Sequence, residues 1–448
     1  MFHWFESRVD PYPAGPPPQP PRGFFPFVWA ATRGLRTLIV SLTVLTAVIG
    51  AFEALLFSML GSVVDWLAQV PAGQLWAQQK SHLLLLAGIL FASPLLIWLH
   101  ALCKYQGLAG NFAMRLRWNF HRHLLGQSMG FYQDEFAGRV AAKVMQSALA
   151  VRDTILICSD IMVFVVIYFV TMTAVVGHFD LALMAPFLCW LVLYLLTLLF
   201  FVPRLSRAAK TQADARSLMT GRITDAYTNI STVKLFAQGQ REAGFVKSAM
   251  QEFMTTVYRQ MRLVTGIEVI NHTLNMLLIA GTAGGALWLW SRGAVGIGAV
   301  AAATAMALRL NGIAHWIMWE MSNLFEQIGT VQDGISTLSR PIAINDAADA
   351  QPLKVTRGEI RFDDVSFAYG GDKRVIEHLA LTIRPGEKIG LVGRSGAGKS
   401  TLVNLLLRFY DVEHGRILID GQDIAHVTQD SLRSQVGMVT QDTSLLHR

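Results

Sequence analysis

Cysteine and charged side chains are scarce in this sequence. Only three cysteines occur in 448 residues, Cys103, Cys158 and Cys189, each within or at the end of an apolar run. They give neither a disulfide framework nor a paired metal-ligand spacing, so we interpret them as small buried hydrophobic residues. Charged residues make up 15 % of the chain and hydrophobic residues 52 %, whereas soluble domains are about one quarter charged. This composition argues against both a uniformly soluble enzyme and a disordered chain.

Six apolar stretches dominate the chain up to residue 319. Each reaches the roughly 20 residues that a helix needs to cross a bilayer. They cover residues 37–60, 83–103, 154–177, 181–203, 264–290 and 294–319. Only residues 178–180 separate the third stretch from the fourth, which predicts a tight turn between antiparallel helices. Residues 1–36 lack the compact apolar core of a signal peptide. Residues 11–21 hold seven of the 15 prolines, so we expect a stiff, extended lead-in there or, as an alternative, an SH3-type ligand.

The basic residues are very unequally distributed among the connections. Residues 1–36, 104–153 and 204–263 together carry 21 lysines and arginines, whereas the connections on the other side carry two, Lys80 and Arg292. Because basic loops stay in the cytoplasm, we predict a multi-pass protein of the cell membrane with both termini cytoplasmic. The same bias accounts for the net charge of +7 without a nucleic-acid partner.

The two predicted cytoplasmic loops, 104–153 and 204–263, are long and keep a helical apolar periodicity, as in Val140, Val144 and Ala148. We therefore expect the second to fifth spans to continue as helices into the cytoplasm and to turn back near residues 134–138 and 222–229. A channel or a solute carrier does not need helices that extend this far into the cytoplasm. A pump that is driven by a cytoplasmic domain does need them.

Polar residues inside apolar spans are costly unless they face a partner or a cavity. They are Glu53, Asp160, Glu268, Asn271, His272, Asn275, Arg309, Asn311, His315 and Glu320. Those of the fifth span recur at i, i+3, i+4 and i+7 and share one helical face. Two interpretations are equally open, namely bonds between helices and a polar stripe that lines a translocation cavity. His272 and His315 are isolated histidines without the company of a metal-ligand cluster, so we predict no metal site at either of them.

The composition changes after residue 340. Residues 341–357 form a predicted linker, and strand-like runs follow at 358–370, 375–383 and 388–392. The last run leads directly into a glycine-rich loop of the pattern G-x-x-x-x-G-K-[ST], and an apolar helical run begins at Thr401. The loop consists of Gly393, Arg394, Ser395, Gly396, Ala397, Gly398, Lys399 and Ser400.

This pattern is suited to binding phosphate. Glycines let backbone N–H groups close on phosphate oxygens without a side-chain clash, and the N-terminus of the following helix attracts negative charge. Lys399 supplies a cation for the β- and γ-phosphates, and the hydroxyl of Ser400 is a ligand for Mg²⁺. The loop and Thr401 therefore predict a site for ATP and Mg²⁺.

From about residue 30 onward the sequence resembles ATP-binding cassette exporters of subfamily B, the bacterial multidrug and lipid half-transporters. Residues 365–369 resemble the family's aromatic loop and place Tyr369, 24 residues before the phosphate loop, for stacking on adenine. Residues 436–442 resemble its Q-loop strand, which implies that Gln441 senses Mg²⁺ and the attacking water. Residues 131–139 and 222–237 resemble its two cytoplasmic coupling loops, the second of which docks on the partner's nucleotide domain.

The sequence stops at Arg448, before the signature loop, the second acidic strand with the catalytic glutamate and the switch histidine that the resemblance implies. Residues 417–420 do not replace that acidic strand: they lead into Gly421, which predicts a β-hairpin, so Asp420 is not the magnesium ligand. We therefore expect a truncated sequence that hydrolyses no ATP by itself.

The prediction is a half-transporter of four parts. A proline-rich segment (1–36) precedes an all-α domain of six transmembrane helices (37–340), a linker (341–357) and the first half of a P-loop α/β domain (358–448). We expect ATP-driven export of an amphipathic drug or lipid across a bacterial inner membrane, by a homodimer or heterodimer. The alternatives are a membrane-anchored ATP sensor and a non-hydrolysing half of a heterodimer. A tethered P-loop GTPase or kinase ranks below them, because no guanine-reading Asn-Lys-x-Asp motif follows the loop.

Overall fold

The computed structural model describes residues 2–71, 74–135, 137–370, 374–394 and 396–439. The chain forms two compact units. The first contains residues 1–14, 21–118 and 145–335, and the second contains residues 15–20, 119–144 and 336–448. The second unit thus includes the middle of the long connection between the second and third spans, together with the glycine-rich loop.

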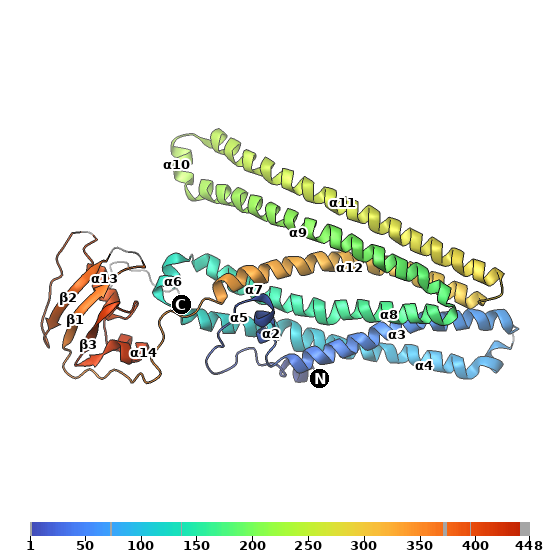
Figure 1. Cartoon of the computed structure of the whole chain (residues 1–448), viewed down its shortest axis with the longest axis horizontal. Helices are drawn as coiled ribbons and strands as arrows, with labels where there is room; N and C mark the ends of the chain where they lie inside the picture. The colour runs from blue at the N-terminus through green and yellow to red at the C-terminus, as the bar shows by residue number, and fades with distance from the viewer. Residues whose placement is uncertain (1, 72–73, 136, 371–373, 395, 440–448) are drawn as a thin grey trace. The chain divides into compact units, whose positions relative to one another are not determined.

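Long helices make up most of the first unit (Figure 1). Six helical stretches of the described residues are long and apolar enough to cross a membrane, which confirms the six predicted spans. In chain order the helices are α3 (Arg36–Gln69), α4 (Leu75–Ala101), π-helix η1 (Leu102–Ala109), α5 (Gly110–Leu125), α7 (Ala137–Leu156), π-helix η2 (Ile157–Ile161), α8 (Met162–Phe179), η3 (Leu181–Leu183), α9 (Met184–Thr228), α11 (Gly239–Ser291) and α12 (Ile297–Leu338). The short helices α1 (Phe2–Glu6), α2 (Phe24–Ala31) and α10 (Ile230–Leu235) also belong to the first unit, whereas the short helix α6 (Met129–Asp134) belongs to the second.

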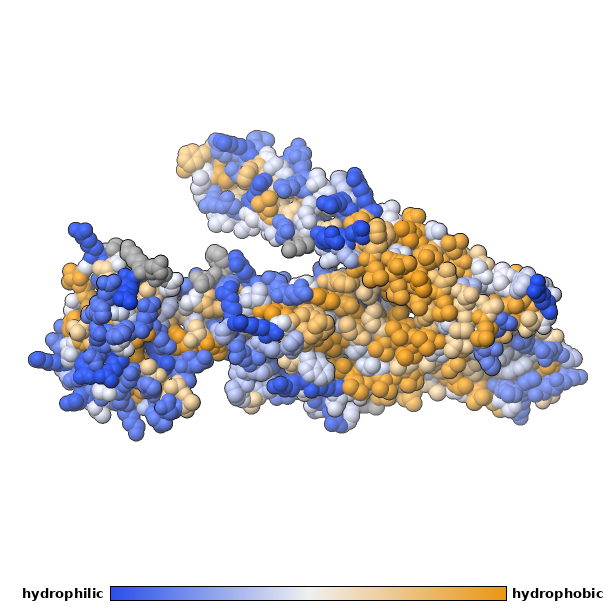
Figure 2. Space-filling model, viewed as in Figure 1, coloured by the Kyte–Doolittle hydropathy of each residue, from blue (hydrophilic) through white to orange (hydrophobic). Residues whose placement is uncertain are grey.

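The helices turn where the sequence predicts. α6 ends at Asp134 and α7 begins at Ala137, while α9 ends at Thr228 and is followed by α10. Between α8 and η3, Asp180 is extended and its carboxylate accepts the N–H of Ala182 at 2.7 Å, which caps the next helix. Figure 2 shows the apolar side chains of the first unit gathered in a band over the helices, with hydrophilic side chains toward the α10 end of α9 and α11. This pattern fits helices that cross a lipid layer and continue into water.

The expectation that all three cysteines are buried is wrong for two of them. Cys103 is buried, but Cys158 and Cys189 are exposed on the helices that carry them. Burial inside protein is unnecessary for an apolar residue that faces lipid, so the apolar runs could not by themselves tell a core position from a lipid-facing one.

The second unit contains an antiparallel sheet of order β2-β1-β3-β4. Its strands are β1 (Ile360–Phe367), β2 (Ile376–Ile383), β3 (His414–Ile419) and β4 (Gln422–Asp423). The helices α13 (Lys399–Leu406) and α14 (Gln429–Ser434) and the 3₁₀-helix η4 (Ile424–His426) accompany it. Its core joins Phe362, Val365 and Ile417 of the sheet to Leu405 of α13 and Leu432 of α14.

The predicted hairpin at residues 417–420 is confirmed, because β3 and β4 pair on either side of Asp420 and Gly421. Asp420 accepts backbone N–H groups of Thr356 at 2.7 Å and of Arg357 and Glu359 at 2.8 Å. The N–H of Arg357, with those of Thr356, Gly358 and Glu359, holds the pKa of the Asp420 carboxyl well below its usual range. Asp420 therefore holds residues 356–359, which directly precede β1, by hydrogen bonds.

Two predicted strands are wrong. Residues 388–392, before the phosphate loop, and residues 436–439, before Gln441, are irregular in the structure. Val392 is 98 % exposed and Val439 is 99 % exposed. A strand needs a neighbour for its N–H and C=O groups, and no strand among the described residues pairs with either segment.

Helices α3 and α12 approach closely at two glycines. A β-carbon on Gly298 would overlap the carbonyl oxygen of Gly61. The carboxylate of Asp65 also accepts the N–H of Gly298 at 2.7 Å. This contact leaves no room for a side chain on either helix.

We predict that Gly298→Ala lowers the free energy of unfolding by roughly 1–3 kcal/mol, because an extra carbon forces α3 and α12 apart. Gly312→Ala is the matched control on the same helix, since nothing lies within 4 Å of a β-carbon there. Chemical unfolding in detergent measures both variants. Equal stability of the two would contradict the close contact.

Candidate functional site

The glycine-rich loop has the backbone that its pattern predicts. Gly396 has φ +82° and Gly398 has φ +83°, values in the left-handed region that side chains rarely adopt. Gly398 is also the residue before α13, and a β-carbon there would lie 3.3 Å from the carbonyl oxygen of Val375. The loop therefore opens directly onto a helix N-terminus, the arrangement that binds anions.

Lys399, Ser400 and Thr401 form the first turn of α13. The Nζ of Lys399 donates to the carbonyl oxygens of Gly393 at 2.8 Å and Arg394 at 2.9 Å, so the ammonium lies across the loop. Ser400 is exposed and Thr401 is buried. An exposed hydroxyl beside a phosphate loop is the type of oxygen ligand that Mg²⁺ accepts, so Ser400 fits that ion. Ser395 and Gln441 lie outside the described residues.

Tyr369 lies next to this loop, two residues after β1. Its hydroxyl donates to Oγ1 of Thr401 at 3.1 Å, which ties the aromatic ring to the first turn of α13. Its ring meets that of Phe367 edge to face, with centroids 4.8 Å apart. Because 46 % of Tyr369 is exposed, ring surface remains open for stacking. The structure thus brings together the residues that the sequence separates by 32 positions.

Two residues near the exposed ring of Tyr369, the proposed adenine platform, could not be identified from the sequence. Tyr410 meets Tyr369 edge to face, with centroids 5.0 Å apart and an interplanar angle of 87°. The Tyr410 hydroxyl donates to Oε1 of Gln133 in α6 at 2.6 Å. An aromatic residue soon after the loop helix was the available signal for Tyr410, but no local pattern pairs it with a residue 277 positions earlier.

The first unit contains a charged cluster centred on Asp160 in η2, which is 5 % exposed. Its Oδ1 accepts the hydroxyl of Thr46 at 2.6 Å and lies 2.9 Å from Nε2 of His100. Its Oδ2 lies 2.7 Å from Nζ of Lys104. Asp160 was identified from the sequence as a polar residue within a span, but its three partners were not. The i, i+4 spacing of His100 and Lys104 was a usable signal, because it places both on one helical face.

A cavity lies beside this cluster. It has a volume of about 660 Å³, and its charged or ionisable lining residues are His100, Lys104, Asp160, Arg309 and Glu320. A second cavity of about 400 Å³ shares Ile49, Ile97 and Arg309 with it and adds Glu53 to the lining. The guanidinium of Arg309 pairs with the Glu53 carboxylate at 3.2 Å. Polar groups of α3, α4, η1, η2 and α12 therefore face a shared space.

Two residues of the polar stripe in the fifth span support the first interpretation, bonds between helices. Asn271 and Asn275 are buried. Asn275 accepts the indole N–H of Trp190 at 2.9 Å and donates to Asn311 at 2.9 Å, so these residues join helices. Glu268 and His272, by contrast, are exposed in this chain.

Comparison with known proteins adds to this geometry. Residues 38–313 match the family described as ABC transporter transmembrane region, and residues 376–448 match the family described as ABC transporter. An uncharacterized ABC transporter ATP-binding protein of Haemophilus influenzae is 54 % identical over 449 residues, which cover 100 % of this chain and 73 % of that protein. An ATM1-type heavy metal exporter of Novosphingobium aromaticivorans is 31 % identical over 241 residues, 54 % of this chain and 39 % of that protein. The structure of a bacterial Atm1-family ABC exporter with ATP bound matches with a TM-score of 0.73 and 25 % identity, covering 91 % of this chain and 72 % of that one.

We predict that Asp160→Asn lowers the free energy of unfolding by roughly 3 kcal/mol, because the partly buried ammonium of Lys104 loses its counter-charge. Asp153→Asn is the matched control. Asp153 pairs with its neighbour Arg152 at a partly exposed position, so its loss should cost at most about 1 kcal/mol. Unfolding in detergent measures both, and equal losses would show that the Asp160 cluster contributes no more than a surface pair.

Proposed function

Because this chain belongs to the ABC transporter family, we propose that it is a half-transporter that binds ATP at the loop of residues 393–400 and exports an amphipathic substrate. The proposal rests on three features that lie together: the left-handed backbone of Gly396 and Gly398, the N-terminus of helix α13, and the exposed ring of Tyr369. These groups offer complementary surfaces to a phosphate chain and to a base.

Each part of the nucleotide has a proposed partner. Adenine stacks on Tyr369, and the loop N–H groups with Lys399 bind the β- and γ-phosphates. Mg²⁺, when bound, neutralises phosphate charge; Ser400 would hold it, and Gln441 would be its second protein ligand. Lys399 then exchanges its carbonyl contacts in the loop for phosphate oxygens, a change that its flexible stem allows. The expectation that these 448 residues alone hydrolyse no ATP stays a prediction.

The membrane cavities support an amphipathic substrate. Phe52, Leu56 and Phe57 line the smaller cavity, and the Glu53–Arg309 pair provides charge there. A drug or lipid with an apolar body and a polar group matches this lining. Alternating access then requires ATP to change which side of the membrane the cavity faces. A membrane-anchored ATP sensor remains the alternative, and the presence of these cavities argues against it.

A second half-transporter, identical or related, is the proposed partner. The segment around α10 leaves large apolar side chains open, with Tyr227 72 % exposed, Leu235 78 % exposed and Phe236 64 % exposed. Exposed apolar residues in a cytoplasmic loop favour docking on another chain. The charge bias of the loops supports an orientation with both termini cytoplasmic, and the bacterial relatives support a bacterial inner membrane.

We predict that Lys399→Ala in the intact transporter lowers ATP hydrolysis by about 100-fold or more, because the transition state loses a cation at the phosphates. Lys388→Ala removes the same charge outside the loop and should leave hydrolysis unchanged. Phosphate release from reconstituted protein measures both. Full activity of the Lys399 variant would rule out the proposed loop function.

We predict that Tyr369→Ala weakens ATP binding by roughly tenfold, since stacking on one base contributes about 1–3 kcal/mol. Tyr369→Trp keeps an aromatic face and should retain most of the affinity. Titration calorimetry with ATP compares the variants, and inorganic tripolyphosphate is the control ligand because it has no base. If ATP binds the Ala and Trp variants alike, adenine lies elsewhere.

A further inference from the structure

The adenine platform is in contact with a second tyrosine. The rings of Tyr369 and Tyr410 are perpendicular, and both also contact Phe367, whose ring centroid lies 4.8 Å from that of Tyr369 and 5.6 Å from that of Tyr410. Three mutually packed rings leave little freedom to each. A base that fixes the ring of Tyr369 from its exposed side therefore also restricts the ring of Tyr410.

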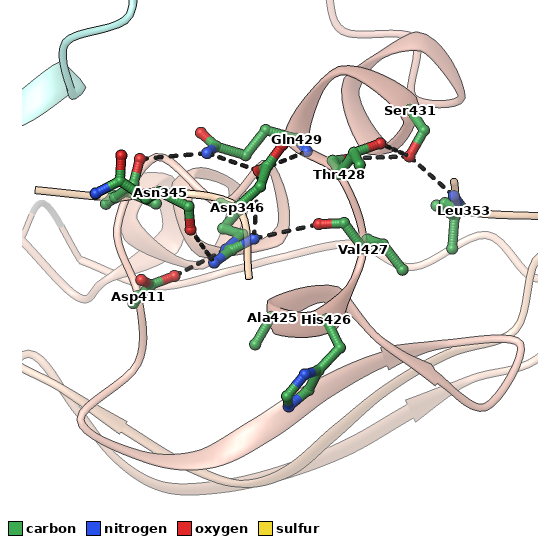
Figure 3. A network of polar contacts seen from close by, with 12 residues as sticks. Asn345, Asp346, Leu353, Asp411, Ala425, His426, Val427, Thr428, Gln429 and Ser431 are labelled. Carbon is green, nitrogen blue, oxygen red and sulfur yellow. Dashed lines mark hydrogen bonds and ion pairs between the residues drawn. The ribbon is translucent and has the colours of Figure 1, made fainter. Parts of the chain in front are cut away.

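The segment that carries Tyr410 is firmly held. Arg408 is 5 % exposed, and its guanidinium donates to the carboxylate of Asp411 at 3.0 Å and to the carbonyl oxygens of Asn345 at 3.1 Å and Val427 at 3.3 Å (Figure 3). Arg433 donates to the carbonyl oxygens of Leu407 and Arg408. The N–H of Glu413 donates to the carbonyl oxygen of Ser366. The backbone is therefore held by hydrogen bonds both before and after Tyr410, which limits how far the chain can shift when its ring is restricted.

Tyr410 also reaches the first cytoplasmic loop. Its hydroxyl donates to Gln133 of α6 at 2.6 Å, and a β-carbon on Gly130 would lie 3.6 Å from its ring. α6 is a separate short helix, because Glu135 after it is extended, with φ −120° and ψ 132°. Through α5 and α7, α6 is continuous in sequence with the second and third spans, which carry His100, Lys104 and Asp160.

We propose that Tyr410 couples occupancy of the adenine platform to the docking of α6 on the same chain. Tyr410 is a positioning residue in this account: base stacking orders Tyr369, the ring contact orders Tyr410, and the hydroxyl of Tyr410 then holds Gln133. This inference rests on the proposed nucleotide site. Beyond that site, we propose that binding of the base, and not only of the phosphate chain, stabilises the docking of α6.

Hydrogen–deuterium exchange on the full 448-residue chain in detergent tests the coupling. We expect saturating MgATP to slow exchange in residues 396–406 and in residues 129–135, the latter by about fivefold or more, as for a typical coupling between sites. Magnesium tripolyphosphate should slow only residues 396–406, because it cannot stack on Tyr369. Tyr410→Phe and Gln133→Leu should lose the effect at 129–135 and keep it at 396–406.

Two controls separate coupling from loss of structure. Gln133→Glu keeps an acceptor for the Tyr410 hydroxyl and should retain the ATP effect on α6. Tyr132→Phe removes a hydroxyl from the same helix that donates instead to the carbonyl oxygen of Leu124, and it should also retain the effect. If ATP slows residues 396–406 but not α6, or if Tyr410→Phe responds like the unmodified chain, the coupling is wrong while the nucleotide site stands. If ATP slows neither segment, the nucleotide site and the coupling fail together.

Discussion

Backbone hydrogen bonding in lipid is the constraint on which the rest of this structure depends. A bilayer offers no water to N–H and C=O groups, so each spanning segment must satisfy them within its own helix. The chain therefore forms long helices and places its turns outside the apolar runs, as at Asp180 and between Thr228 and Ile230. The same helices extend beyond their apolar runs, and the short helices α6 and α10 lie in the connections between them.

Departures from regular α-helix occur next to the polar groups of the spans. The π-helix η1 contains Lys104, and the π-helix η2 contains Asp160, its partner at 2.7 Å. π-helical turns are rare and occur often at functional sites. Here they place a charged pair beside a cavity.

Local patterns predicted the parts of the fold that depend on local chemistry. The six spans follow from apolar length, and the loop at Gly396–Ser400 follows from the positive φ that only glycine adopts easily. Contacts between distant helices were beyond such patterns: Asp160 was predicted as a costly polar residue, but its pairing with Thr46 depends on helix packing across 114 positions. Residues 388–392 were wrongly predicted as a strand. Alternating side chains show that a segment could fit into a sheet, but they do not show that a neighbouring strand is there to pair with it.

The central claim is that ATP at the phosphate loop changes the membrane cavity. Ser93 lines the cavity beside Glu53 and Arg309, so a cysteine there reports its accessibility. In the intact transporter with its native cysteines replaced, the labelling rate of Ser93→Cys by a water-soluble thiol reagent should change about fivefold or more on addition of MgATP. The change should vanish when Lys399→Ala is added. An equal labelling rate with and without MgATP would contradict the account.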